Sequence, residues 1–195
     1  MKNNLSAIIL SAGESSRMGS PKALLKIGET TFLEKIYKNL LICHFHEIIV
    51  LLGKDNDKIK LKFEKLLVKF IVNESYKQGQ LSSIIKALDS VKEESEGIFL
   101  TLVDMPLVQS ETMKILIEEW NSNKDKIIIP EYENRGGHPV IFPKKFFPEL
   151  RAAPLEEGAR FVVYNNKDKV IRVPVKDIGI RKDFDYPKDL DELDL

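Results

Sequence analysis

The stretch Ala7-Ile8-Ile9-Leu10-Ser11-Ala12-Gly13 decides the fold, because an apolar run passes directly into a loop of small residues. Ala7 to Leu10 has the composition of a short buried strand. The loop continues as Glu14-Ser15-Ser16-Arg17-Met18-Gly19-Ser20-Pro21-Lys22. Small residues let backbone N–H groups approach a polyphosphate closely, Arg17 can bind phosphate oxygens bidentately, and Lys22 supplies a mobile positive charge. The stretch therefore predicts a polyphosphate site after the first strand.

Two common phosphate loops are excluded by the order of residues. Gly19 is followed by Ser-Pro-Lys, whereas a Walker A loop has Gly-Lys-Ser/Thr at this point. The loop also lacks the Gly-x-Gly-x-x-Gly pattern, which weakens a dinucleotide interpretation. By composition alone, a polar strand-to-helix turn with incidental basic residues explains the loop equally well. The rest of the chain has to decide between these interpretations.

Short apolar runs alternate with longer amphipathic stretches along most of the chain. The expected further strands are Glu47 to Leu52, Phe70 to Val72, Gly97 to Val103, and Lys126 to Ile129, which Pro130 would stop. The expected helices are Thr31 to Leu41, Asp55 to Leu67, Gln80 to Val91 and Ser110 to Trp120. Thr31-x-x-Glu34 resembles a capping box, and Ser110 is the expected N-cap of its helix. This alternation predicts right-handed βαβ units and a mostly parallel sheet.

The pattern loosens after Glu131, where glycines, prolines and aromatic residues gather. Here we expect an added strand over Val140 to Phe142 and a helix over Leu155 to Tyr164. A further strand, which could run antiparallel, is expected over Val170 to Val175, and a short final helix over Pro187 to Leu193. The predicted fold is a three-layer, Rossmann-like α/β domain of residues 1–195. It has helices on both faces of a mostly parallel sheet and a smaller antiparallel addition near the C-terminus.

Composition excludes several classes of function. Lys+Arg and Asp+Glu both count 30, so the formal net charge is zero, which argues against a general nucleic-acid binder. The single cysteine, Cys43, cannot form an internal disulfide, which suits a reducing compartment, and its apolar surroundings favour a buried structural role. No apolar run approaches the roughly 20 residues of a membrane span, and the N-terminal run is too short for a secretory signal. We therefore expect a cytoplasmic protein without nucleic-acid or membrane partners.

Acidic residues follow the strand Gly97 to Val103 and recur near the C-terminus. Asp104 precedes Met105-Pro106, and ligands of open α/β sheets bind at the carboxyl ends of strands. Magnesium is typically bound by one or two carboxylates plus substrate phosphates. A simple turn cap before Pro106 would also explain Asp104, and a solvated acidic tail would explain Asp183-Phe184-Asp185.

These motifs together resemble one family. The stretch Leu10-Ser11-Ala12-Gly13-x-x-x-Arg17-Met18-Gly19-x-Pro21-Lys22 resembles the signature of nucleotidyltransferases with a glycosyltransferase-A-like fold. The branch is the one that includes molybdenum cofactor cytidylyl- and guanylyltransferases. Its Asp-x-Pro motif matches Asp104-Met105-Pro106, and its Asp-x-Asp-x-Pro-x-Asp-Leu ending matches Asp183 to Leu190. The resemblance extends from Ala7 to Leu190, with the motifs in the family's order.

The resemblance implies a role for each matching residue. The backbone of Ala12 and Gly13 would hold the triphosphate together with Arg17, and Leu10 and Ser11 would also contact the nucleotide. Lys22 would stabilise charge on the α-phosphate as pyrophosphate leaves, and Asp104 and Asp185 would bind Mg²⁺. Further nucleotide contacts would come from Asn73, Gly79, Ser82 and Ser83, although a capped helix start explains the two serines almost as well.

The acceptor side is implied less completely. The family carries Arg-Gly-His-Pro near the acceptor, which places His138 there, although a lone histidine is more often structural. The extra glycine of Arg135-Gly136-Gly137-His138-Pro139 leaves the alignment of Arg135 open. Arg160 lies in a matching Gly-Ala-Arg, but the family's preceding Gly-Asp is absent, so its role is open, as is that of Asp183.

The implied reaction is in-line attack by an acceptor phosphate on the α-phosphorus of CTP, with release of pyrophosphate. Ala12 favours CTP, because guanylyl members tend to have glycine there. The implied acceptor is molybdopterin or molybdenum cofactor, and a molybdenum hydroxylase apoenzyme is a possible partner. The alternatives are a guanylyltransferase, and a cytidylyl- or uridylyltransferase for a sugar phosphate or phosphocholine. A non-catalytic nucleotide-binding cofactor chaperone is an alternative from a different class.

Overall fold

The computed structural model describes residues 3–193 and is built around one sheet with the strand order β10-β7-β9-β6-β1-β4-β5. Strand β1 (Leu5–Ser11) is central and pairs in parallel with β4 and β6. Among the described strands of this sheet, β9 and the short β8 run against the others. The remaining bounds are β4 Glu47–Leu52, β5 Lys69–Val72, β6 Gly97–Leu102, β7 Ile127–Tyr132, β8 Arg135–Gly136, β9 Val140–Pro143 and β10 Val170–Pro174. A second, two-stranded sheet joins β2 (Lys26–Ile27) to β3 (Thr30–Thr31).

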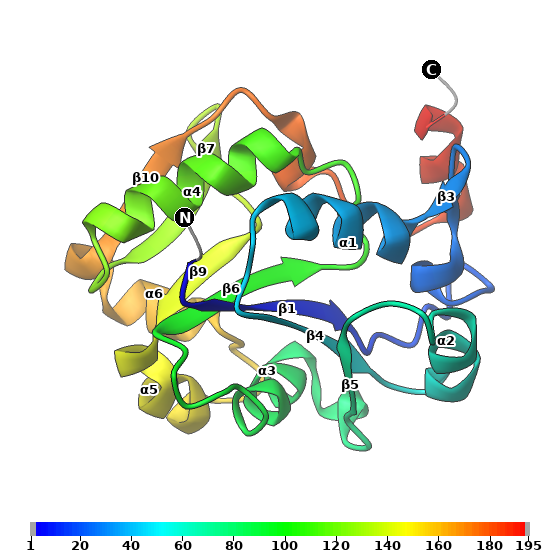
Figure 1. The fold of residues 1–195 in the computed structure, drawn as a ribbon, viewed down its shortest axis with the longest axis horizontal. Helices are drawn as coiled ribbons and strands as arrows, with labels where there is room; N and C mark the ends of the chain where they lie inside the picture. The colour runs from blue at the N-terminus through cyan, green and yellow to red at the C-terminus, as the bar shows by residue number, and fades with distance from the viewer. Residues whose placement is uncertain (1–2, 194–195) are drawn as a thin grey trace.

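Helices cover both faces of the sheet (Figure 1). One face carries α1 (Phe32–Ile42), α2 (Asn56–Lys62) and α4 (Ser110–Ser122), and the other carries α3 (Gln80–Leu88), α5 (Phe147–Ala152) and α6 (Arg160–Asn165). Side chains alternate along β1, so Ala7 and Ile9 enter the first core while Ile8 and Leu10 enter the second. The apolar run of β1 is therefore buried on both sides, and the three-layer, mostly parallel fold is confirmed.

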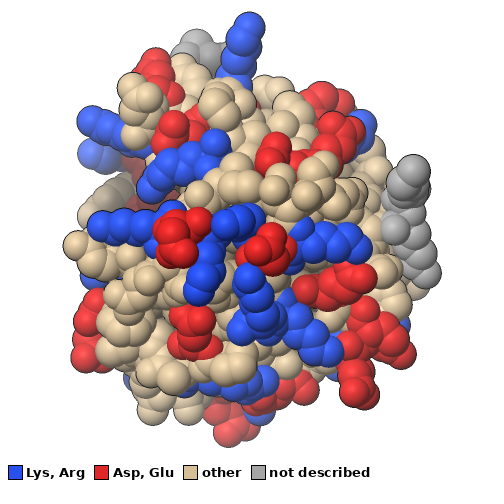
Figure 2. Space-filling model, turned by 90° about the vertical axis from the view of Figure 1, so that its left-hand side faces the viewer, with Lys and Arg blue, Asp and Glu red and all other residues tan. Residues whose placement is uncertain are grey.

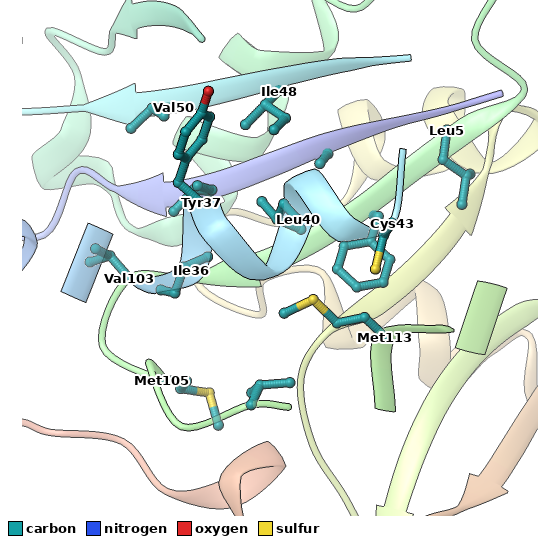
Figure 3. Close-up of a cluster of buried hydrophobic side chains, with 14 of the residues drawn as sticks. Leu5, Ile36, Tyr37, Leu40, Cys43, Ile48, Val50, Val103, Met105 and Met113 are labelled. Carbon is teal, nitrogen blue, oxygen red and sulfur yellow. The ribbon is translucent and has the colours of Figure 1, made fainter. Parts of the chain in front are cut away.

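The first core lies between α1, α4 and the sheet. Figure 3 shows Ile36 and Leu40 of α1 in front of the strands, with Met113 of α4 nearby. Cys43 lies at the end of α1 and is buried, as the sequence predicts. Burial raises the pKa of its thiol to about 11, so this cysteine remains protonated and unreactive at neutral pH.

The region after β6 differs from the expectation in two places. Strand β7 continues past Pro130 to Tyr132, because the Pro130 carbonyl still accepts a hydrogen bond from the Gly137 N–H at 3.0 Å. Strand β10 pairs in parallel with β7, so the antiparallel expectation for this strand is wrong. The helices α5 and α6 connect β9 to β10, and β10 starts at the same edge of the sheet at which β9 ends. β10 therefore runs opposite to β9 and parallel to β7.

Three helix boundaries also differ from the expectation. Helix α2 ends at Lys62, because the Leu66 N–H turns back to the Phe63 carbonyl and leaves Leu67 84% exposed. Helix α6 begins at Arg160, since Gly158 adopts a positive φ of 67° and ends the preceding turn. The N-cap of α4 is Gln109, while the Ser110 hydroxyl bonds to the neighbouring Glu111.

The end of the molecule opposite the carboxyl ends of the strands carries charges of both signs. Figure 2 shows basic and acidic side chains intermingled on this face. Asp125 precedes β7 and Lys145 follows the antiparallel β9, so their ion pair, with Lys145 Nζ 3.6 Å from Asp125 Oδ2, lies at this end of the sheet. Within residues 3–193, no helix is long and apolar enough to cross a membrane.

The capping box of α1 gives a test of the local structure. The Thr31 N–H donates to Glu34 Oε2 at 2.8 Å, and the Glu34 N–H donates to Thr31 Oγ1 at 3.3 Å. We expect Thr31→Ala to lower the free energy of unfolding by about 1 kcal/mol, because it leaves a helix N–H without its acceptor. Ser110→Ala is the matched control and should be nearly neutral, since Ser110 caps no helix. Urea denaturation of both variants measures the difference, and equal losses would contradict the assignment.

Candidate active site

A cavity of about 370 Å³ opens at the carboxyl ends of β1, β4 and β6. The loop after β1 forms one wall, and the N-terminus of α3 with the segments after β4 and β6 forms the others. The lining includes Leu10, Ser11, Ala12, Gly13, Arg17, Lys22, Lys54, Asp55, Tyr76, Gly79, Gln80, Ser83, Asp104 and Asp185. The carboxyl edge of an open α/β sheet is where ligands bind, so the cavity lies where the sequence predicts it.

The loop after β1 is folded back on itself. The Met18 N–H donates to the Ser15 carbonyl at 3.0 Å, and the Met18 side chain is buried beneath the loop. Ser15 Oγ then accepts from the Lys22 N–H at 3.2 Å. These bonds bring Lys22 back toward the start of the loop, so Gly13 and Lys22 line one cavity although nine positions separate them.

Lys22 lies between two carboxylates from distant parts of the chain. Its ammonium donates to Asp104 Oδ2 at 2.8 Å and also to Asp185 Oδ1. The Lys22 side chain is only 13% exposed. Burial alone would lower the pKa of Lys22, but the hydrogen bonds to Asp104 and Asp185 outweigh it, so the pKa lies above its ordinary value. The ammonium is therefore charged throughout the neutral range.

Asp185 reaches this position because its neighbours anchor the tail. The Phe184 N–H donates to the Asp104 carbonyl at 3.0 Å, and the buried Phe184 ring packs edge-on against Phe32. Asp189 Oδ2 accepts from the Asp185 N–H at 2.9 Å and from the Tyr186 N–H at 2.7 Å, which braces the turn before η6 (Pro187–Leu193). Within the described part of the chain, Asp183 is exposed and lies outside the linings of both cavities.

Arg17, which is predicted to bind the triphosphate, lines the same cavity. Its guanidinium is 5.3 Å from the centre of the Tyr186 ring, the residue that follows Asp185. Arginine over an aromatic face is an attractive arrangement, worth about 0.5–1 kcal/mol when exposed. The loop after β1 and the C-terminal tail are thus linked at Arg17 as well as at Lys22.

The segment after β5 contains residues that line the cavity and a buried residue that holds them in place. Asn73 is buried, and its amide donates to Ser82 Oγ and to Ser83 Oγ, both at 3.0 Å. Gly79 and Ser83 line the cavity, whereas Asn73 and Ser82 lie outside the described lining. Gly79 has a φ of 98°, a conformation that L-residues rarely adopt, and is the N-cap of α3. Asn73 therefore stands behind the cavity wall and fixes the two serines.

A second cavity of about 790 Å³ adjoins the first and shares Gly79 and Gln80 with it. Its floor is apolar and comes from Leu100, Val140 and Phe142, and its charged lining includes Arg160 and Arg172. His138 lines this cavity, while Arg135 lies outside its described lining. Burial lowers the pKa of His138, although a hydrogen bond with the Leu100 backbone and the Asp104 carboxylate oppose the shift, so its imidazole is neutral at pH 7.

Several lining residues were not predicted from the sequence. Lys54 and Asp55 follow the expected strand Glu47 to Leu52 after one intervening glycine, and the carboxyl end of that strand was a usable signal. Arg172 lies within β10 and reaches the second cavity because that strand pairs with β7. No pattern in the sequence distinguishes Arg172 from a solvated strand residue.

The two carboxylates fit a divalent cation that shares its coordination with a ligand. Asp104 Oδ1 is buried and has no hydrogen-bond partner in the part of the chain that the structure describes. Asp185 Oδ1 accepts a hydrogen bond from the same ammonium group that contacts Asp104. Among the described residues, no group of three or more His, Cys, Asp or Glu side chains is arranged to hold a metal. Oxygens from a phosphate or water would therefore have to complete the coordination of a divalent cation here.

Comparison with known proteins decides the family. Residues 7–170 match the model of the MobA-like NTP transferase domain. The chain belongs to the MobA-like NTP transferase family. As a member, the protein is a nucleotidyltransferase, and the cavity walled by the loop after β1 is its candidate active site.

Individual members of the family show how far the likeness extends. The molybdenum cofactor cytidylyltransferase of Escherichia coli (strain K12) is 32% identical over 185 residues, which are 95% of this chain and 93% of that protein. A probable molybdenum cofactor guanylyltransferase of Methanosarcina mazei is 31% identical over 92% of this chain and 81% of its own length. The structure of Rv0371C from Mycobacterium tuberculosis in complex with manganese superposes with a TM-score of 0.83 and 25% identity, covering 97% of each chain. The glycosyltransferase-A-like fold is thereby confirmed.

The position of Lys22 between two acids gives a prediction about pH. In Lys22→Met the two carboxylates face each other without a cation, so their negative charges repel each other in the folded protein. This repulsion destabilises the folded protein at neutral pH and weakens at low pH, where carboxylates lose their charge. We therefore expect the stability loss of Lys22→Met, relative to the wild type, to be larger at pH 7 than at about pH 4.

Urea denaturation at the two pH values measures this difference. Lys35→Met, on the exposed face of α1, is the control for loss of a lysine charge. A loss that is the same at both pH values, or that Lys35→Met reproduces, would contradict the pairing of Lys22 with both acids.

Proposed function

We propose that the protein transfers the cytidylyl group of CTP to a phosphorylated acceptor, most specifically molybdopterin or molybdenum cofactor, and releases pyrophosphate. One observation carries the proposal: Lys22, Asp104 and Asp185 meet in the cavity that the loop after β1 encloses, beside a second cavity of the size of a small acceptor. The 32% sequence identity to a molybdenum cofactor cytidylyltransferase, which extends over 95% of this chain, supports the choice of reaction. We also propose that residues 1–195 act as a single nucleotidyltransferase domain.

The nucleotide side of the proposed reaction rests on charge and on the backbone. The backbone of Ala12 and Gly13 receives the triphosphate, and Arg17 grips its oxygens. Lys22 leaves its carboxylates for the α-phosphate, where it offsets the charge that grows as pyrophosphate departs. Asp104 and Asp185 would hold Mg²⁺, which when bound neutralises phosphate oxygens and assists departure of the leaving group. No covalent intermediate is required, because positioning and charge neutralisation supply the catalysis.

The acceptor side rests on the second cavity. Leu100, Val140 and Phe142 give its lining an apolar part, which suits a ring system such as a pterin. Lys77, Arg160 and Arg172 are the cationic side chains of its lining, and His138 offers a neutral imidazole to the acceptor. Gly79 and Gln80 border both cavities, so an acceptor phosphate in the second cavity would face the nucleotide in the first. A molybdenum hydroxylase apoenzyme is the proposed recipient of the product.

Guanylyl transfer is the second candidate, because the probable guanylyltransferase of Methanosarcina mazei is 31% identical to this chain. The two candidate functions differ in the base of the nucleotide, which is cytosine in one and guanine in the other. Ala12 adds a methyl group beside the base region where guanylyl members tend to have glycine, which leaves less room for a purine. A panel of the four ribonucleoside triphosphates with molybdopterin and with sugar phosphates, scored by pyrophosphate release, tests the proposal. Release with none of these acceptors would refute it, and a tenfold preference for GTP, about 1.4 kcal/mol, would refute its cytidylyl part.

Asp104 gives the sharpest test of the chemistry. We expect Asp104→Asn to reduce the rate of pyrophosphate release by about 100-fold or more, because the amide cannot replace the charge of a carboxylate toward the cation. Circular dichroism should show an unchanged fold. Asp125→Asn, at the opposite end of the sheet, is the matched control and should keep its activity. Full activity in Asp104→Asn would remove this residue from the mechanism.

Ala12 gives a test of base selection. Ala12→Gly should shift the ratio of kcat/KM for CTP to that for GTP toward GTP, by up to about tenfold, since removing a methyl group from a packed site changes discrimination by about 1 kcal/mol. Ser16→Gly, an exposed position in the same loop, controls for added loop flexibility. An unchanged ratio in Ala12→Gly would exclude Ala12 as the determinant of the base.

A further inference from the structure

A buried carboxylate lies outside the described linings of both cavities and yet joins the loops that form them. Asp177 is 4% exposed and follows β10 in the chain. Its two oxygens accept hydrogen bonds from three donors: the Gln109 N–H, the Thr112 hydroxyl and the Gly179 N–H. Each donor belongs to a segment next to a proposed active-site residue.

The first link reaches the loop that carries Asp104. Asp177 Oδ2 accepts from the Gln109 N–H at 2.9 Å and from Thr112 Oγ1 at 2.8 Å, at the start of α4. Gln109 is the N-cap of α4 and makes no capping bond with its own side chain. A helix N-terminus has unpaired N–H groups and favours a negative charge. Asp177, which is remote from α4 in the sequence, therefore acts as the capping group that the N-cap side chain does not provide.

The second link reaches the loop that carries His138. The segment η5 (Ile178–Arg181) follows Asp177, and its Ile180 carbonyl accepts from the His138 N–H at 2.9 Å. A Cβ atom on Gly137 would lie 2.0 Å from the Ile180 carbonyl oxygen, and one on Gly179 would lie 2.6 Å from the backbone of Leu107. The segment is therefore wedged between the loop of His138 and the loop of Asp104, with room for little movement.

The third link continues along the chain to Asp185. A few residues after η5, the Phe184 N–H donates to the Asp104 carbonyl at 3.0 Å. Asp185 then pairs with Lys22. The direction that the chain takes at Asp177 thus sets where the tail meets the loop of Asp104.

We propose that Asp177 is a positioning residue that fixes the cation-binding pair Asp104 and Asp185 relative to His138, and so aligns the nucleotide cavity with the acceptor cavity. This inference rests on the proposed function for the roles of those three residues. Misplacement of reacting groups by about 1 Å can cost about 100-fold in rate, so a residue remote from substrate can control turnover in this way.

The test compares three variants in Mn²⁺ affinity, nucleotide affinity and turnover. In Asp177→Asn the amide nitrogen faces either the Gln109 N–H or the Gly179 N–H, so one contact is lost whichever way the amide turns. We expect weaker Mn²⁺ binding in the presence of CTP and a fall in kcat of about 10- to 100-fold. CTP affinity without metal should be unchanged, because the loop after β1 keeps its own bonds. Thr112→Val removes one donor and should produce a smaller shift in the same direction.

Ser95→Ala is the matched control. Ser95 is equally buried and its hydroxyl donates to the Gly97 carbonyl, at the amino end of β6. It should lower the melting temperature without changing Mn²⁺ affinity or kcat. If Asp177→Asn and Thr112→Val also lose only stability, Asp177 is purely structural and the inference is overturned. If Asp177→Asn fails to fold, Thr112→Val alone decides by the same criterion.

The readouts separate this inference from the proposed function. Mn²⁺ affinity in the presence of CTP is measured by electron paramagnetic resonance without any acceptor. Should the wild type release no pyrophosphate with any acceptor, the proposed function fails. In that case, weaker Mn²⁺ binding by Asp177→Asn and Thr112→Val would still support the positioning role, and unchanged binding would overturn it.

Discussion

The ammonium group of Lys22 between Asp104 and Asp185 is the interaction on which the site depends. It joins the loop after the first strand, which carries Lys22, to the end of a central strand and to the C-terminal tail. Asp104 is 82 positions and Asp185 is 163 positions away from Lys22 in the sequence. The three groups are only partly exposed, so their charges interact more strongly than they would in water. The interaction also keeps two carboxylates together that would otherwise repel each other. Any cation that replaces Lys22 therefore finds both carboxylates already in place.

The sheet explains why these distant segments meet. β1 and β6 are neighbours and run in the same direction, so the residues that follow them emerge at the same edge. The tail returns to this edge because Phe184 has a buried place beside Phe32, at the start of α1. In an extended stretch the residues on either side of a buried side chain point away from it, and Asp185 accordingly faces Lys22. The apolar core thus determines the position of a charged group that lies outside it.

The sequence predicted the elements that have a local cause. The apolar run of β1 and the capping box at Thr31 need only near neighbours, and both are confirmed. The expected stop at Pro130 and the expected N-cap at Ser110 were wrong because partners from elsewhere decide them, the N–H of Gly137 in one case and Asp177 in the other. Asp104 was predicted from its place at the end of a strand and from a family motif, and Asp185 from the family motif alone, whereas Asp177 and Arg172 carry no pattern that separates them from solvated residues. Their surroundings are formed only by the assembled fold.

The charge of the nucleotide cavity bears on how a triphosphate could enter it. Arg17, Lys22 and Lys54 line the cavity, but so do Glu14, Asp55, Asp104 and Asp185, so its basic side chains do not outnumber the acidic ones. A bare triphosphate would bring further negative charge into a cavity whose best-placed ammonium is already committed to two carboxylates. A triphosphate that arrives with a divalent cation changes this balance, because the cation can take over Asp104 and Asp185 while Lys22 turns to the phosphate oxygens. On this argument the pairing seen at Lys22 favours nucleotide and metal binding together over either binding alone.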